Sequence, residues 1–187
     1  MKVLSRWDAY DGFVRVEELG TDIGDRIVIH ATDSVAIFIY NETTDEILLI
    51  SQPRAPMISD ENPSGEIVEV VAGRFDKDIA LMQLIINEVE EEFGCKIFDH
   101  QVVILNRGQP LALSPGILTE KQYLAYVTVT SDQIEKGDGM FGADGEGEEI
   151  TRKFVPVSFL ENMIFQDMKT WALVQWFLKM RLLHKKS

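Results

Sequence analysis

The stretch that decides the fold is residues 73–95, GRFDKDIALMQLIINEVEEEFGC. At about 100° per residue, its apolar side chains gather on one arc of a helix, which suits that arc to burial. The side chains expected on this arc are Met82, Ile85, Ile86, Val89 and Phe93. The pattern therefore predicts an amphipathic helix over residues 78–93, with Asp78 as its N-cap and Gly94 as its C-terminal stop.

Three carboxylates occupy the arc beside the apolar one. Glu88, Glu91 and Glu92 are spaced i, i+3 and i+4, whereas Glu90 points away from both arcs. Like charges at this spacing repel each other and weaken a helix by roughly a few tenths of a kcal/mol per pair. A hard divalent cation would offset this repulsion, because Mg²⁺ prefers oxygen ligands. An ordinary solvated acidic helix end explains the spacing equally well, so the spacing alone leaves both interpretations open.

The composition restricts the classes of partner. The chain carries 18 Lys and Arg against 31 Asp and Glu, a formal net charge of −13, which argues against a nucleic-acid backbone as the main partner. No apolar run is long enough for a membrane span, and the N-terminal residues lack a secretory signal, so we expect no membrane partner. The single cysteine, Cys95, has no nearby histidine and is expected to be a packed side chain. A lone thiol suits a reducing cytoplasm, where we expect the protein to reside.

The remaining segments predict strands more often than helices. An antiparallel hairpin is expected from residues 13–17 and 26–30. Further strands are expected at residues 34–40, 46–50, 66–71, 101–105, 122–129 and 153–157. The final helix, residues 168–183, should present one face composed of Trp171, Val174, Phe177, Leu178 and Arg181. Strands and helices mix without strict alternation, which indicates a mixed α/β (α+β) sandwich.

The helical stretch resembles the Nudix box. That motif consists of a glycine, five residues, a glutamate, seven residues, Arg-Glu, an aliphatic residue, any residue, Glu-Glu, any residue, a glycine and an aliphatic or small residue. The residues in register are Gly73, Glu88, Val89, Glu91, Glu92 and Gly94. Two positions depart: Ile79 replaces the first glutamate and Asn87 replaces the arginine. In the family those two residues usually form an ion pair, so neutral residues have replaced both partners together.

Two segments before the box resemble the ADP-ribose and GDP-mannose pyrophosphatase branch of the Nudix superfamily. Residues 51–54 (SQPR) resemble its Gln-aromatic-Arg element, which implies that Arg54 contacts substrate phosphates. Residues 67–73 (IVEVVAG) resemble its Glu-x-x-Ala-Gly element, which implies that the Ala72 carbonyl is a metal ligand and that Glu69 lies near the substrate. Glu69 is equally suited to a structural ion pair with Arg54.

Two later segments extend the resemblance. Residues 114–120 (SPGILTE) match the branch segment Ser-Pro-Gly-x-x-x-Glu, which implies that Glu120 reaches the substrate. Residues 145–150 (GEGEEI) resemble the acidic loop that carries a catalytic base. Both Glu146 and Glu148 are candidates for that base, and Glu148 is preferred. A solvated acidic loop is the alternative for this segment.

The resemblance implies a Nudix-type α/β/α sandwich with a mixed sheet and an N-terminal antiparallel β hairpin. Residues 1–32 would form a dimerising β region and residues 33–187 the hydrolase domain. The implied reaction is Mg²⁺-dependent hydrolysis of the pyrophosphate bond of a nucleotide-sugar of the ADP-ribose or GDP-mannose type, with Mn²⁺ as a substitute metal. The products would be a nucleoside monophosphate and a sugar phosphate. The implied metal ligands are Ala72, Glu88, Glu91 and Glu92, with Glu91 also a candidate catalytic group.

Two other functions fit the same sequence. The departures at Ile79 and Asn87 suggest a catalytically impaired Nudix protein that binds a nucleotide-sugar without cleaving it. The acidic surface suggests a scaffold that binds a basic protein partner. The small-molecule hydrolase, acting as a homodimer, is the interpretation that we favour.

Overall fold

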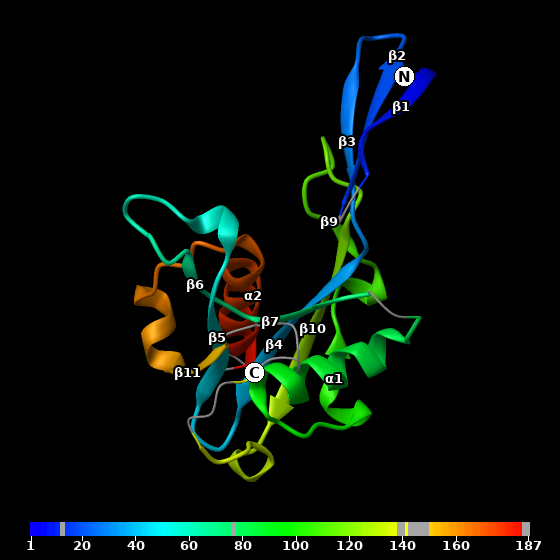
Figure 1. Cartoon of the computed structure of the whole chain (residues 1–187). Coiled ribbons are helices and arrows are strands. Elements are labelled where there is room, and N and C mark those ends of the chain that lie inside the picture. The colour runs from blue at the N-terminus through cyan, green and yellow to red at the C-terminus, as the bar shows by residue number, and fades with distance from the viewer. Residues whose placement is uncertain (12–13, 76–77, 138–140, 142–149, 185–187) are drawn as a thin grey trace.

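A computed structural model describes residues 1–11, 14–75, 78–137, 141 and 150–184 (Figure 1). Within these residues, an eight-stranded sheet has the order β11-β5-β4-β10-β8, with β6 beside β5, β7 beside β4 and β9 beside β10. Its strands are β4 (Ser34–Asn41), β5 (Glu46–Pro53), β6 (Glu66–Glu69), β7 (Val71–Arg74), β8 (Val102–Ile104), β9 (Leu111–Ala112), β10 (Lys121–Val129) and β11 (Thr151–Pro156). The two α-helices are α1 (Leu81–Phe93) and α2 (Met168–His184). Short 3-10 helices occupy Ala55–Met57, Asp99–Gln101, Asn106–Gly108, Ser131–Gln133 and Val157–Asn162.

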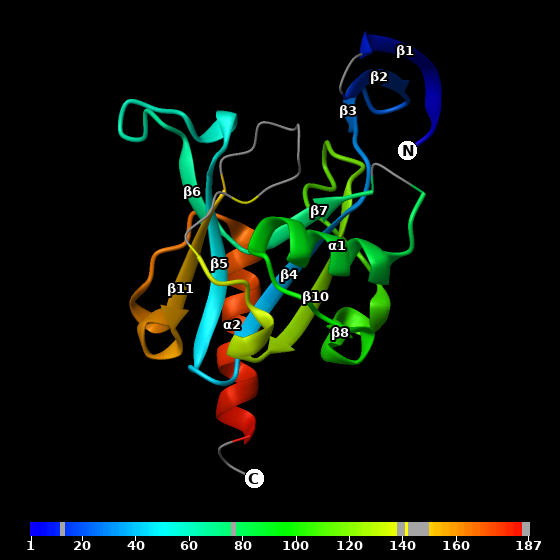
Figure 2. The ribbon, with the colours of Figure 1, turned by 60° about the horizontal axis from the view of Figure 1, so that its bottom comes forward.

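Strand β4 lies at the centre of the sandwich, which explains why its sequence is almost continuously apolar. It pairs parallel with β10 and antiparallel with β5 and β7, so the sheet is mixed. Figure 2 shows α1 on one face of the sheet and α2 on the other. Successive side chains of a strand point to opposite faces, so Val35 packs in the cluster under α1 and Ala36 in the cluster under α2. The predicted mixed α/β sandwich is confirmed.

Helix α1 starts later than its sequence predicts. It begins at Leu81, after Ala80, whose backbone is extended and which makes no side-chain cap; the prediction of Asp78 as N-cap was wrong. Ile79 packs against the core under α1, and this contact holds Asp78 outside the helix. The predicted stop is confirmed, because Gly94 is left-handed at φ 61° and donates its N–H to the Glu90 carbonyl at 2.9 Å.

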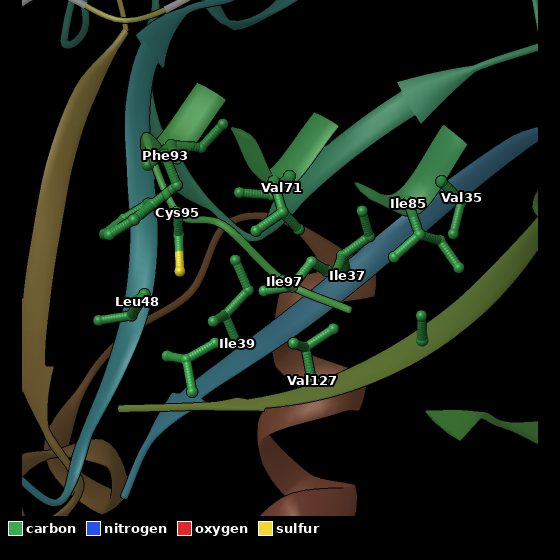
Figure 3. Close-up of a cluster of buried hydrophobic side chains, with 14 of the residues drawn as sticks. Val35, Ile37, Ile39, Leu48, Val71, Ile85, Phe93, Cys95, Ile97 and Val127 are labelled. Carbon is green, nitrogen blue, oxygen red and sulfur yellow. The ribbon is translucent and has the colours of Figure 1, made fainter. Parts of the chain in front are cut away.

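The apolar face of α1 agrees in part with the prediction. Ile85, Val89 and Phe93 are buried, whereas Met82 and Ile86 are only half-buried. Leu84 is buried as well, although it was not expected on this face. Figure 3 shows several of these side chains meeting those of the central strands.

Helix α2 is anchored by polar contacts at its first turn. The Asp167 carboxylate accepts hydrogen bonds from the N–H of Thr170 at 2.9 Å and from its hydroxyl at 2.6 Å. The Thr170 hydroxyl in turn accepts the N–H of Val70 at 2.9 Å, between β6 and β7. This anchor sets the rotation of the helix, so Val174 and Phe177 are buried but Trp171 is 54% exposed. The face predicted for this helix is therefore buried only in part.

The N-terminal sheet has one strand more than predicted. Its order is β1-β2-β3, with β1 (Val3–Asp11), β2 (Arg15–Thr21) and β3 (Arg26–His30), all antiparallel. Strand β1 was not predicted because its register with β2 is irregular at two places, which interrupts the alternation of its side chains. The sheet projects away from the rest of the chain (Figure 1). Within the described part of the chain, neither helix combines the length and apolar content that a membrane-crossing segment needs.

Cys95 is fully buried in the core under α1, as predicted, and Figure 3 shows its sulfur among apolar side chains. Burial raises the pKa of the Cys95 thiol to about 12, although the nearby Arg152 acts in the opposite direction. Only the thiolate is nucleophilic, so we expect the native protein not to react with Ellman's reagent at pH 8. Denaturation in guanidinium should expose one reactive thiol per chain. Rapid labelling of the native protein would contradict this prediction.

Candidate active site

Two carboxylates of α1 converge on the dipeptide Ala72-Gly73 in β7. The Ala72 N–H donates to Glu92 Oε2 at 3.2 Å, and the Glu92 residue is only 5% exposed. Glu88 lies against Gly73 so closely that a Cβ built on Gly73 would be 2.2 Å from the Glu88 Cδ. Gly73 is therefore required for the position of Glu88. Glu91, which precedes Glu92, is exposed to solvent.

The donor set around Ala72-Gly73 fits a hard divalent cation bound through few protein ligands. Among the described residues, no group of three or more His, Cys, Asp and Glu side chains is placed to hold a metal ion. Two carboxylates and a backbone carbonyl nevertheless suit Mg²⁺, which keeps several waters and is usually bound through one or two carboxylates together with substrate phosphates. These acids are therefore not simply solvent-exposed surface residues, because Glu88 and Glu92 both contact Ala72-Gly73.

A charged cluster lies where β5 and β6 meet the start of α2. The Glu69 carboxylate, in a residue only 2% exposed, accepts a hydrogen bond from Arg54 Nε at 2.8 Å and another from Gln52 Nε2 at 3.2 Å. It also contacts Lys169 Nζ, which is 3.1 Å from the Asp167 carboxylate. These five residues are called the Glu69 cluster below. Of the two roles left open for Glu69, the ion pair with Arg54 is present.

Arg54 keeps part of its donor capacity in this cluster. Its side chain is 40% exposed, and it uses Nε for Glu69. Among the described residues, no hydrogen bond or ion pair engages its two terminal nitrogens. A guanidinium held at one edge presents its other donors in a fixed fork, which is the geometry that phosphate oxygens require.

Lys169 is a residue that the sequence did not single out for a role. Its side chain is only 16% exposed, and its ammonium forms an ion pair with the Glu69 carboxylate. Asp167 followed by Thr170 three positions later is a pattern typical of a helix start. Lys169 lies between these two residues, so the start of α2 places it beside Glu69. The role of Lys169 follows only from its long-range contact with Glu69, which no local sequence pattern predicts.

The other predicted substrate residues are less closely assembled. Glu120 accepts a hydrogen bond from the Ser34 hydroxyl at 2.6 Å, and Ser34 in turn accepts one from the buried Gln122 side chain at 3.1 Å. In the part of the chain that the structure describes, no hydrogen bond or ion pair connects Glu120 with the Glu69 cluster. Glu146 and Glu148 lie outside the described residues.

The described flanks of that acidic segment are fixed to the end of α1. Phe141 and Ile150 exchange two backbone hydrogen bonds of 3.3 Å. The Arg152 guanidinium lies 4.0 Å from the centre of the Phe141 ring and donates to the Phe93 carbonyl at 3.2 Å. Phe141 and Arg152, on either side of that segment, thus lie near the end of the helix that carries Glu88 and Glu92.

Comparison with known proteins shows the family of the chain. Over 169 residues the chain is 31% identical to the GDP-mannose pyrophosphatase of Yersinia enterocolitica, a Nudix enzyme, and the match covers 88% of this chain and 83% of that protein. The chain belongs to the Nudix family. No protein-family model matches it.

The structure explains how this Nudix box accommodates its two departures. Ile79, at the position of the first glutamate, packs on the apolar core under α1. Asn87, at the position of the arginine, accepts a hydrogen bond from Gln83 Nε2 at 2.7 Å. An apolar contact and a hydrogen bond along the helix therefore stand where the Nudix ion pair usually lies, and Glu88 and Glu92 keep their approach to Ala72-Gly73.

Proposed function

We propose that this protein hydrolyses the pyrophosphate bond of a nucleoside diphosphate joined to a sugar, releasing a nucleoside monophosphate and a sugar phosphate. The observation that carries the proposal is the convergence of Glu88 and Glu92 on Ala72-Gly73. The name of the Yersinia relative supports the same reaction class and a substrate of the GDP-mannose type. A small-molecule substrate suits the net charge of −13, and the lone thiol suits a cytoplasmic enzyme.

Some residues of the site would hold the metal that neutralises the phosphates, and others would position the pyrophosphate. Glu88, Glu92, Glu91 and the Ala72 carbonyl would hold Mg²⁺, or Mn²⁺ in its place, which when bound neutralises phosphate charge and acidifies a water molecule. Arg54, held by Glu69, orients the pyrophosphate, and Lys169 forms a second ion pair with the buried Glu69 carboxylate. Glu148 or Glu146 accepts the proton from the attacking water. Phosphoryl transfer depends mainly on positioning and charge neutralisation, which such a site supplies.

The test is a turnover screen on the full chain. ADP-ribose, GDP-mannose, UDP-glucose and a dinucleoside polyphosphate are incubated with Mg²⁺, with Mn²⁺ and with EDTA, and a phosphatase then releases phosphate from the products. We expect metal-dependent release from at least one nucleotide-sugar and none in EDTA. Thermal stabilisation by these ligands without any product would instead support the binding protein that the Ile79 and Asn87 departures suggest.

We also propose that the protein is a homodimer assembled through its N-terminal sheet. Residues 3–10 of β1 are exposed, and Leu4 is 64% exposed. Exposed apolar side chains on a projecting sheet usually mark an interface. Sedimentation should give twice the mass of one chain, and Leu4→Asp should shift it to the monomer. Leu182→Asp on α2, where the leucine is 59% exposed, is the matched control that should stay dimeric. A monomeric wild-type protein would refute the proposal.

A further inference from the structure

A pocket opens at one end of the central strands. It has a volume of about 320 Å³ and is lined by Thr32, Asp33, Phe75 and Tyr123. Its walls come from three neighbouring strands, since Thr32 and Asp33 precede β4, Phe75 follows β7 and Tyr123 belongs to β10. The Phe75 N–H donates to the Asp33 carbonyl at 3.0 Å, which continues the pairing of β4 with β7 to the pocket.

The pocket lies on the same face of the sheet as Glu88. Tyr123 is in register with Val35, and both pack in the core under α1. Asp33 lies two residues before Val35, and Phe75 lies two residues after Gly73, so the period of two directs them to that face as well. Two residues of extended strand span about 6.6 Å, so the pocket lies about that far along β7 from the contact between Gly73 and Glu88. In a nucleotide the ribose separates the phosphates from the base, so this offset suits a base whose phosphates lie beside Glu88.

The lining suits a planar, hydrogen-bonding group. The Phe75 and Tyr123 rings pack edge to face, with their centroids 5.8 Å apart and their planes at 62°, and both line the pocket. Asp33 Oδ1 accepts the N–H of Lys121 at 2.9 Å, which fixes the carboxylate. Among the described residues, nothing donates to Asp33 Oδ2. Ligand pockets commonly combine aromatic walls with a few polar groups of this kind.

We propose that this pocket binds the nucleobase and that Asp33 selects guanine. The N1–H and the 2-amino group of guanine lie side by side, so one carboxylate can accept both. Adenine has an unprotonated N1 and no 2-amino group, so it cannot make this pair. The inference rests on the proposed function for the placement of the phosphates beside Glu88, and it adds the choice of base.

The test measures binding rather than turnover. GDP, ADP and xanthosine diphosphate are titrated calorimetrically into the full chain in the presence of Mg²⁺. We expect GDP to bind the wild-type protein about tenfold to hundredfold more tightly than ADP, the usual discrimination of a two-bond base contact. Asp33→Asn should lose this preference and gain affinity for xanthosine diphosphate, because the amide N–H can donate to the 2-carbonyl of xanthine. The asparagine can still accept the Lys121 N–H, so the fold should be retained.

The matched control is Asp22→Asn. Asp22 also accepts one backbone N–H, that of Lys2 at 2.8 Å, and it lies in the turn between β2 and β3, so its replacement should leave the order of the three nucleotides unchanged. Equal affinity of the wild-type protein for GDP and ADP, or an unchanged order in Asp33→Asn, would overturn the assignment of the pocket. Guanine-selective binding without hydrolysis would instead overturn the proposed reaction and leave the pocket standing. Hydrolysis with an unaltered base preference in Asp33→Asn would overturn the assignment of the pocket and leave the proposed reaction standing.

Discussion

Replacing Glu92 by glutamine should lower metal-dependent turnover by at least about 10²-fold, with little change in thermal stability. The loss is expected because the substitution removes a charge that would hold the metal beside the phosphates, and phosphoryl transfer depends on charge neutralisation. Stability should survive because a glutamine oxygen can still accept the Ala72 N–H, as Glu92 Oε2 does at 3.2 Å. Turnover is followed by phosphate release at several Mg²⁺ concentrations, and stability by thermal denaturation.

The same helix provides the control for this substitution. Glu90 is also on α1 but its side chain is 54% exposed, and it lies 3.9 Å from Lys96 rather than near Ala72. Glu90→Gln removes one negative charge from the same helix, so it reproduces any general electrostatic effect. We expect it to retain full turnover. Loss of equal size in both variants, or full activity in Glu92→Gln, would remove Glu92 from the reaction.

Replacing Gly73 by alanine should lower activity but leave stability nearly unchanged. The new Cβ would meet the Glu88 carboxylate at 2.2 Å, and the end of that flexible side chain can move away without disturbing the core. Misplacing a catalytic group by about 1 Å can cost roughly 10²-fold in rate. We therefore expect a fall in kcat of about tenfold to hundredfold, while the melting temperature shifts by only a few degrees.

A double-mutant cycle identifies the route of this effect. If Gly73→Ala acts by moving Glu88, then adding it to Glu88→Ala should cause little further loss of kcat, because the carboxylate is already absent. Additive losses would show that the alanine disturbs something else, such as the pairing of β7 with β4. A fully active Gly73→Ala variant would show that the close approach of Glu88 to the strand is dispensable.

Local patterns predicted the core of the fold correctly. The apolar run of β4 needs burial on both faces, and the structure provides it with one helix on each side. Gly94 ended α1 as predicted, because a left-handed residue there is easiest for glycine. The start of α1 was placed too early, since the packing of Ile79 on the core, a tertiary contact, outweighs the capping preference of Asp78.

Local geometry predicted the candidate site only where its residues share one element, although the sequence also offered the ion pair between Arg54 and Glu69 that the structure contains. Glu88 and Glu92 lie on a single helix, so their common face follows from helical geometry. The role of Lys169 depends on its contact with Glu69, which lies a hundred positions earlier in the chain. No local pattern contains that information. The pocket at Asp33 and Phe75 likewise depends on strand register, which fixes which side chains meet on one face.

The attachment of Thr170 to Val70 and of Lys169 to Glu69 constrains the order in which the protein can mature. During translation, the strand that carries Glu69 leaves the ribosome long before residues 167–170 do, so its buried carboxylate at first lacks the ammonium that neutralises it. A nascent chain that stops short of α2 lacks the finished surroundings of Arg54. The enzyme is therefore expected to acquire its catalytic competence in a single late step, when α2 docks.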